Sequence, residues 1–163
     1  MPVISRNLKI KEVPDVYQKI LVPLDGSTTA ECALSHVKNL VKDGAAGEVT
    51  LLNVVNVYPP LRGEYTGRID IDTMRERIFT ESRKYLAEVE SRLASEGIKV
   101  KVETLEGNQP ADTISDYARK TGVNMIVIAT HGYTGLRKLM FGSVALGVLH
   151  ESHLPILLIR PES

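Results

Sequence analysis

Five short apolar segments, each separated from the next by a helical pattern, constrain the fold of this chain most strongly. Between the segments, apolar residues recur every three to four positions, as on one face of an amphipathic helix. A regular alternation of strands and helices predicts one α/β domain with a five-stranded, parallel, doubly wound, Rossmann-like sheet and right-handed crossovers. The five predicted strands are residues 19–24, 48–57, 99–107, 123–129 and 155–160.

The predicted helices begin and end at residues that favour helix termini. Ser27 or Thr28 follows the first strand and is expected to cap one helix that continues through Val41. Pro110 is expected to start a helix that stops at Gly122, where glycine accepts a left-handed conformation. A long amphipathic helix is predicted between the second and third strands, with one face made by Met74, Ile78, Tyr85, Leu86, Val89 and Leu93.

The composition excludes several classes of protein. Twenty lysines and arginines balance twenty aspartates and glutamates, so no global basic field is present to bind nucleic acid or an anionic membrane. The apolar runs are too short to span a bilayer, and the first residues lack the apolar block of a signal peptide. Cys32 is the single cysteine, so no internal disulfide can form. We therefore expect a cytoplasmic protein, with Cys32 as a half-buried packing residue.

The loop that begins at Ala129 has the features of an anion-binding site. In a doubly wound sheet, ligands bind beyond the carboxyl ends of the strands, where the winding reverses. Glycines in this loop allow backbone amides to approach a phosphate, and Ser143 and Val144 stand where the next helix begins. Neither a P-loop nor a G-x-G-x-x-G motif is present, so the usual dinucleotide site is disfavoured.

Three segments together resemble the universal stress protein family. They are "KILVPLDGS", "TLLNVVNV" and "VIATHGYTGLRKLMFGSVALGVLHESHLPILLIRP", and the resemblance extends from Lys19 to Pro161. The ATP-binding branch of that family carries G-x-x-G, nine residues, then G-[ST]. Gly132 is the second glycine and Gly142-Ser143 closes the pattern, while Ala129 takes the place of the first glycine. An extended backbone accepts the alanine methyl group.

The resemblance implies an adenine nucleotide alpha hydrolase-like fold and an ATP site, with ADP or AMP as further ligands and Mg²⁺ bound through the phosphates. Asp25 would accept hydrogen bonds from the ribose, and its alternative role is a turn residue that caps the next helix; both roles can coexist. The backbone of Val54 would face the edge of the adenine ring. The other implied site residues are Pro23 and Leu24 at the adenosine, Gly132, Gly142, Ser143 and Val144 at the phosphates, and Ile128, Ala129, Thr130, His131 and Tyr133 along the approach.

The sequence offers no residue that we would assign as catalytic. Ser143, His131 and Asp25 suggest a hydrolase triad, but "GSVALG" is not the G-x-S-x-G motif, so helix capping and phosphate binding are the better roles for Ser143. His150 and His153 have a spacing compatible with sharing a metal, but no further cysteine or carboxylate cluster completes a site, and surface histidines near a helix C-terminus are the ordinary explanation. We expect an ATP-binding sensor or regulator with at most slow ATP hydrolysis. A nucleotide-free interaction module of the same fold and a weak ATP or phosphoester hydrolase are the alternatives.

The domain organisation is expected to be simple. Residues 1–16 form an N-terminal extension of undetermined role, and residues 17–163 form the universal stress protein domain. The strand within Pro155 to Arg160 falls at a sheet edge in this topology, and an apolar edge requires a cover or a pairing partner. The resemblance implies a homodimer through this strand.

Overall fold

All five strands of the computed structural model, which describes residues 17–58, 70–130 and 141–161, belong to one parallel sheet. The strand order is β3-β2-β1-β4-β5, so β3 and β5 are the edges. The predicted fold class is confirmed. The strands are β1 (Tyr17–Pro23), β2 (Ala46–Val55), β3 (Lys101–Glu106), β4 (Met125–Ala129) and β5 (Ile156–Ile159).

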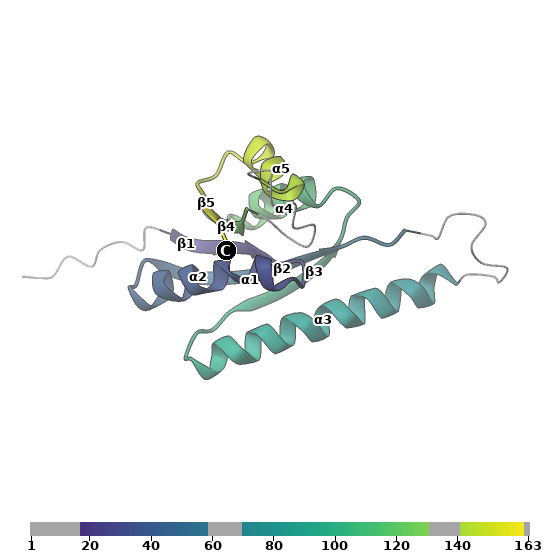
Figure 1. The fold of residues 1–163 in the computed structure, drawn as a ribbon, viewed down its shortest axis with the longest axis horizontal. Coiled ribbons are helices and arrows are strands. Elements are labelled where there is room, and N and C mark those ends of the chain that lie inside the picture. Colours follow the sequence, from purple (N-terminus) through teal and green to yellow (C-terminus); the bar gives the residue numbers. More distant parts are fainter. Residues whose placement is uncertain (1–16, 59–69, 131–140, 162–163) are drawn as a thin grey trace, which may run out of the picture.

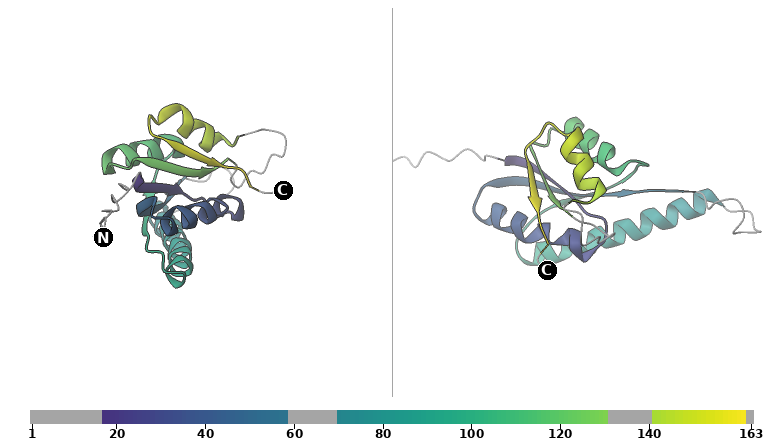
Figure 2. Two further views of the ribbon diagram at one scale, coloured as in Figure 1. Left: turned by 90° about the vertical axis from the view of Figure 1, so that its left-hand side faces the viewer. Right: turned by 45° about the horizontal axis from the view of Figure 1, so that its top comes forward.

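Helices cover both faces of this sheet. Figure 1 shows α1, α2 and α3 below the strands and α4 and α5 above them, and the end-on view in Figure 2 shows the same three layers. This arrangement follows from right-handed crossovers that run in opposite directions from β1. The helices are α1 (Thr28–Glu31), α2 (Ala33–Lys42), α3 (Ile71–Ser95), α4 (Pro110–Thr121) and α5 (Ser143–Glu151).

The first helical segment, predicted as one helix, is divided at Cys32 into α1 and α2. The amide of Cys32 donates to the carbonyl of Thr29 at 3.3 Å, a bond over three residues that tightens the turn as in a 3₁₀-helix. Cys32 itself is a free, half-buried thiol that packs against the core, as predicted, and burial raises its pKa. A raised pKa disfavours the reactive thiolate.

Three predicted helix-end signals, at Ser27, Pro110 and Gly122, are confirmed. The Ser27 hydroxyl accepts a hydrogen bond from the amide of Ala30 at 3.0 Å and caps α1. Pro110 is the first residue of α4, where its missing N–H has no intrahelical partner to lose. Gly122 ends α4 with φ of 70°, a left-handed conformation that costs glycine little.

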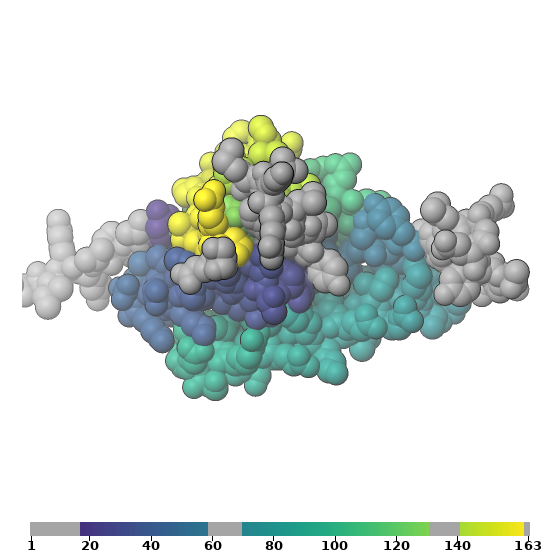
Figure 3. Space-filling model, viewed as in Figure 1, coloured from purple at the N-terminus to yellow at the C-terminus, as the bar shows by residue number. Residues whose placement is uncertain are grey.

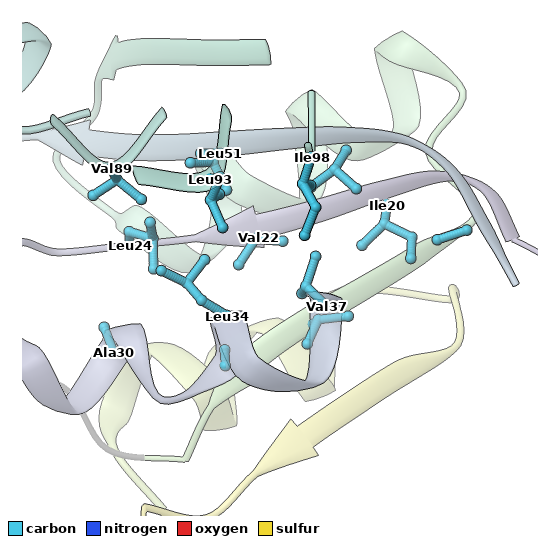
Figure 4. Close-up of a cluster of buried hydrophobic side chains, with 14 of the residues drawn as sticks. Ile20, Val22, Leu24, Ala30, Leu34, Val37, Leu51, Val89, Leu93 and Ile98 are labelled. Atoms are coloured by element: carbon cyan, nitrogen blue, oxygen red, sulfur yellow. The ribbon is translucent and has the colours of Figure 1, made fainter. Parts of the chain in front are cut away.

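The core consists of two clusters, one on each face of the sheet. Alternation along β1 sends Ile20 and Val22 to the face of α1, α2 and α3, together with Leu24 just after the strand, and sends Leu21 to the face of α4 and α5. Figure 4 shows Leu24 and Val22 with Val89 of α3 on one side and Leu34 of α2 on the other. All five residues of β4 are buried, which is expected for a strand covered on both faces.

Only the second half of α3 packs closely on the sheet. Its buried residues are Ser82, Leu86, Val89 and Leu93, whereas Met74 and Ile78 are half-buried and belong to neither core cluster. The predicted apolar face is therefore fully buried only beyond its first two turns. The Ser82 hydroxyl lies 2.8 Å from the hydroxyl of Thr104 on β3, which satisfies two polar groups beneath the helix.

Candidate functional site

A cleft of about 200 Å³ opens where the winding of the sheet reverses, between β1 and β4. The carboxyl ends of β1, β2 and β4 form its floor, and the first turns of α4 and α5 contribute to its walls. This is the location at which a doubly wound sheet binds ligands. The lining residues are Pro23, Leu24, Asp25, Ala30, Leu52, Val54, Pro110, Ile114, Ile128, Ala129, Thr130, Gly142, Ser143, Val144 and Ala145.

The structure brings together all ten of the predicted site residues that it describes. These are Pro23, Leu24, Asp25, Val54, Ile128, Ala129, Thr130, Gly142, Ser143 and Val144. The other three, His131, Gly132 and Tyr133, lie outside the described residues, as do Arg137 and Lys138. The roles assigned to these residues in nucleotide binding remain predictions.

Five further lining residues were not identified from the sequence: Ala30, Leu52, Pro110, Ile114 and Ala145. Leu52 and Ile114 are buried apolar residues, and no local pattern separates such a residue at the cleft from one in the core. Pro110 carried a usable signal, because it starts the helix that follows β3 and therefore stands at the same end of the sheet.

Asp25 lies exposed at the mouth of the cleft and organises the turn after β1. Its Oδ1 accepts hydrogen bonds from the amide of Ser27 at 2.9 Å and from the Ser27 hydroxyl at 2.6 Å. Gly26 between them has φ of 85°, which other residues rarely adopt. The cap of α1 is therefore Ser27, and the alternative that Asp25 itself caps the helix is wrong. Asp25 instead holds the capping residue in place.

The start of α5 is fixed by two backbone hydrogen bonds. The amide of Gly142 donates to the Thr130 carbonyl at 2.5 Å, and the amide of Thr130 donates to the Ile159 carbonyl of β5 at 2.7 Å. Gly142 is the N-cap, and Ser143 is the first helical residue without a capping bond. The predicted capping role of Ser143 is wrong for this reason, and the Gly142 amide is already engaged by a protein acceptor.

Three amides at this helix start remain available for an anion. In the parts of the chain that the structure describes, no group accepts a hydrogen bond from the amides of Ser143, Val144 or Ala145. The first amides of a helix have no intrahelical acceptor and carry its partial positive charge. All three residues line the cleft.

Ala129 occupies its position without backbone strain. It is the last residue of β4 and pairs in parallel register with Ile159 of β5. No non-glycine residue within ranges 17–58, 70–130 and 141–161 has a positive φ. Since a strand residue accepts any side chain, the alanine needs no special conformation here.

An acidic residue behind the cleft is tied to α3. Arg92 Nη2 donates to Glu31 Oε2 at 2.6 Å. The Tyr85 hydroxyl is buried in the same region, and burial first, then the negative charge of Glu31, raises its pKa. This hydroxyl therefore stays protonated at neutral pH.

The described residues hold neither a metal-binding cluster nor a membrane-spanning helix. No group of three or more histidine, cysteine, aspartate or glutamate residues in ranges 17–58, 70–130 and 141–161 is arranged to hold a metal ion. Within the same ranges, no helix combines the length and the apolar composition that crossing a bilayer requires.

Comparison with known proteins decides the family. The sequence profile described as "Universal stress protein family" matches residues 16–160, nearly the whole chain. The chain belongs to the universal stress protein family. Universal stress protein MJ0531 of Methanocaldococcus jannaschii is 33% identical over 158 residues, which cover 94% of this chain and 88% of the relative.

Solved structures of universal stress proteins share this fold. The structure of MJ0577 from M. jannaschii has a TM-score of 0.76 and 32% identity, and it covers 91% of this chain and 99% of that one. A universal stress protein family protein from Arabidopsis thaliana, solved with AMP bound, has a TM-score of 0.64 and 16% identity. The match covers 90% of this chain and 93% of that one. At that identity the likeness establishes the fold alone.

Proposed function

We propose that this universal stress protein binds ATP in the cleft and acts as a nucleotide-dependent sensor or regulator in a stress response, rather than as a dedicated enzyme. The observation that carries the proposal is the convergence of the ten described site residues on one cleft at the reversal of the sheet. The AMP bound to the Arabidopsis relative supports an adenine nucleotide as the ligand. We further propose that the protein works in the cytoplasm.

The cleft has complementary apolar and polar parts. Leu52, Ile114 and Ile128 are buried side chains from β2, α4 and β4 that would contact the flat face of a base. Asp25 stands at the mouth, where its carboxylate would accept hydrogen bonds from ribose hydroxyls. Val54, half-buried at the end of β2, would place its backbone at the adenine edge.

The phosphates would lie at the start of α5. The amides of Ser143, Val144 and Ala145 have no protein acceptor among the described residues, and the Ser143 side chain is exposed. Amides at a helix N-terminus favour anions both as donors and through the helix dipole. Mg²⁺ would be held by the phosphate oxygens, which suits a cation that binds few protein ligands. ADP and AMP would use the same base and ribose contacts.

Calorimetric titration of nucleotide-free protein with ATP and AMP, in the presence of Mg²⁺, tests the proposal. We expect saturable binding of ATP, and loss of that binding in Val54→Trp, because the indole would occupy the cleft. The matched control is Val100→Trp, since Val100 is also half-buried but precedes β3 at the opposite end of the sheet. Absence of ATP binding by folded wild-type protein, as judged by circular dichroism, would contradict the proposal and favour the nucleotide-free interaction module.

We also propose a homodimer through the strand within Pro155 to Arg160. β5 is an edge strand, and Figure 3 shows its yellow atoms at the surface. Pairing of β5 with its two-fold mate would continue the sheet and bring α5 beside its mate on the same face. Leu146 and Leu149, which are 41% and 45% exposed on α5, would then gain an apolar neighbour.

A further inference from the structure

An ion pair joins α3 to α1 behind the cleft, and a buried hydroxyl of α3 lies in the same region. Arg92 Nη2 lies 2.6 Å from Glu31 Oε2, and the Glu31 side chain is only 20% exposed. Tyr85 precedes Arg92 by seven residues, about two helical turns, so both side chains lie on the same side of α3. The Tyr85 hydroxyl is fully buried and forms no hydrogen bond with a residue that the structure describes.

A series of hydrogen bonds connects Glu31 to the carboxylate at the cleft mouth. The amide of Glu31 donates to the Ser27 carbonyl at 3.2 Å, and the amide of its neighbour Ala30 donates to the Ser27 hydroxyl at 3.0 Å. The hydroxyl and the amide of Ser27 in turn donate hydrogen bonds to Asp25 Oδ1. A displacement of α1 would therefore move Ser27 and, through it, Asp25.

Packing reinforces this connection. The ring of Tyr85 packs against the core cluster that contains Leu24 and Ala30, and both of these residues also line the cleft. Figure 4 shows Leu24 between Val89 of α3 and Ala30 of α1. Side chains of α3 thus lie directly behind one wall of the candidate site.

Tyrosine at position 85 is not explained by packing alone. A buried hydroxyl without a partner costs free energy that phenylalanine would avoid. Burial, the charge of Glu31 and, more weakly, the charge of Asp25 raise the pKa of the Tyr85 hydroxyl. The hydroxyl therefore stays protonated, while Arg92 supplies the positive charge that balances Glu31.

We infer that Tyr85 and Arg92 of α3 are positioning residues for the Asp25 carboxylate, and that they act through Glu31 and the first turn of α1. The inference rests on the proposed function, because it requires Asp25 to bind the ribose. Without Arg92, the enclosed Glu31 carboxylate would lose its counter-charge and turn away from the core. Without the Tyr85 hydroxyl, the polar group that α3 buries against the cluster of Leu24 and Ala30 would be lost.

Ribose discrimination is the property that tests this role. We define it as the dissociation constant of 2′,3′-dideoxy-ATP divided by that of ATP, both measured by calorimetry with Mg²⁺. In Arg92→Gln and in Tyr85→Phe we expect this ratio to fall about threefold or more relative to the wild type, because only the ligand with ribose hydroxyls uses Asp25. A merely structural role would weaken both ligands by the same factor.

Two matched variants serve as controls. Arg77→Gln removes an arginine from α3 that is 73% exposed and lies 3.8 Å from Glu81 of the same helix. Tyr117→Phe removes a half-buried hydroxyl from α4 whose pKa is also raised by burial. Both should retain the wild-type ratio. Thermal unfolding of all five proteins monitors stability separately.

The outcomes separate this inference from the proposed function. A reduced ratio in Arg92→Gln and Tyr85→Phe, with unchanged controls, supports the inference. The inference is overturned if the wild type discriminates ribose and the two variants keep the wild-type ratio. It is also overturned if they lose affinity equally for both ligands. Either result leaves the proposed ATP site intact. Wild-type protein that binds neither nucleotide overturns both, and wild-type binding without ribose discrimination overturns the assigned role of Asp25 and the inference with it.

Discussion

A methyl group built on Gly147 of α5 would lie only 2.5 Å from the Cβ atom of Ala111 on α4. The two helices therefore cross at close contact, with only the Ala111 methyl group between their backbones at this point. Both helices also line the cleft, through Pro110 and Ile114 on α4 and through Val144 and Ala145 on α5. The close approach at Gly147 sets the separation of two cleft walls.

We predict that Gly147→Ala destabilises the protein despite the higher helix propensity of alanine. Overpacking costs about 1–3 kcal/mol, whereas the exchange of glycine for alanine inside a helix gains about 0.5–1 kcal/mol, so the net loss should be about 1 kcal/mol. Urea denaturation measures the free energy of unfolding. In an Ala111→Gly background the same substitution should cost less, because the methyl group it meets is absent. An equal cost in both backgrounds would show that the contact is not tight.

Ser27→Ala is expected to affect both stability and nucleotide affinity. The substitution removes the hydroxyl that caps α1 and that donates to Asp25. Loss of such a cap costs about 1 kcal/mol, and Asp25 loses one of the bonds that orient it. Denaturation and ATP titration measure the two effects. Ser35→Ala on α2, where the exposed hydroxyl donates to the Cys32 carbonyl, is the control and should change stability by about 0.5 kcal/mol or less.

The Asp70 carboxylate caps α3 and should titrate below its ordinary range. The Thr73 hydroxyl, followed by the Thr73 and Asp72 amides, holds the pKa of Asp70 below the usual value. A pKa that is lower in the folded than in the unfolded state contributes stability above about pH 3.9, the unfolded value, and this contribution is lost as pH falls through the folded pKa.

Carboxyl chemical shifts measured by NMR between pH 2 and 6 check this assignment. Thr73→Val should raise the pKa of Asp70 towards the unfolded value and so reduce the loss of stability in acid. Thr80→Val, at an exposed position of the same helix, should leave the Asp70 titration unchanged. An Asp70 pKa that does not respond to Thr73→Val would contradict the hydrogen bond.

Leu158→Pro should separate dimerisation from folding. The Pro155 and Ile159 carbonyls accept hydrogen bonds from the amides of Ile126 and Thr130, so in a parallel pair the backbone groups of Leu158 point to the free edge. Proline at position 158 removes the outward N–H without removing a bond to β4. We expect a folded monomer by light scattering, while Leu158→Ala, which keeps the N–H, remains dimeric. A monomeric wild type at micromolar concentration would refute the homodimer.

Much of the site was predictable because its residues stand at strand ends. Asp25 follows the apolar strand β1, and Ala129 is the last residue of β4. The carboxyl ends of parallel strands meet at one edge of the sheet. Leu52 and Ile114 were not predicted as site residues. The sequence pattern around a buried apolar residue is the same whether its side chain lines a ligand cleft or packs in the core.

The sequence by itself determined the order of elements, the parallel sheet and the helix ends at Ser27, Pro110 and Gly122, because periodicity and capping act over a few residues. Only the tertiary structure decided which partners these residues meet. The engagement of the Gly142 amide by Thr130, the contact of Gly147 with Ala111 and the pairing of Glu31 with Arg92 each join segments that are distant or separately folded. Such contacts depend on how the layers pack, and local sequence patterns do not predict that packing.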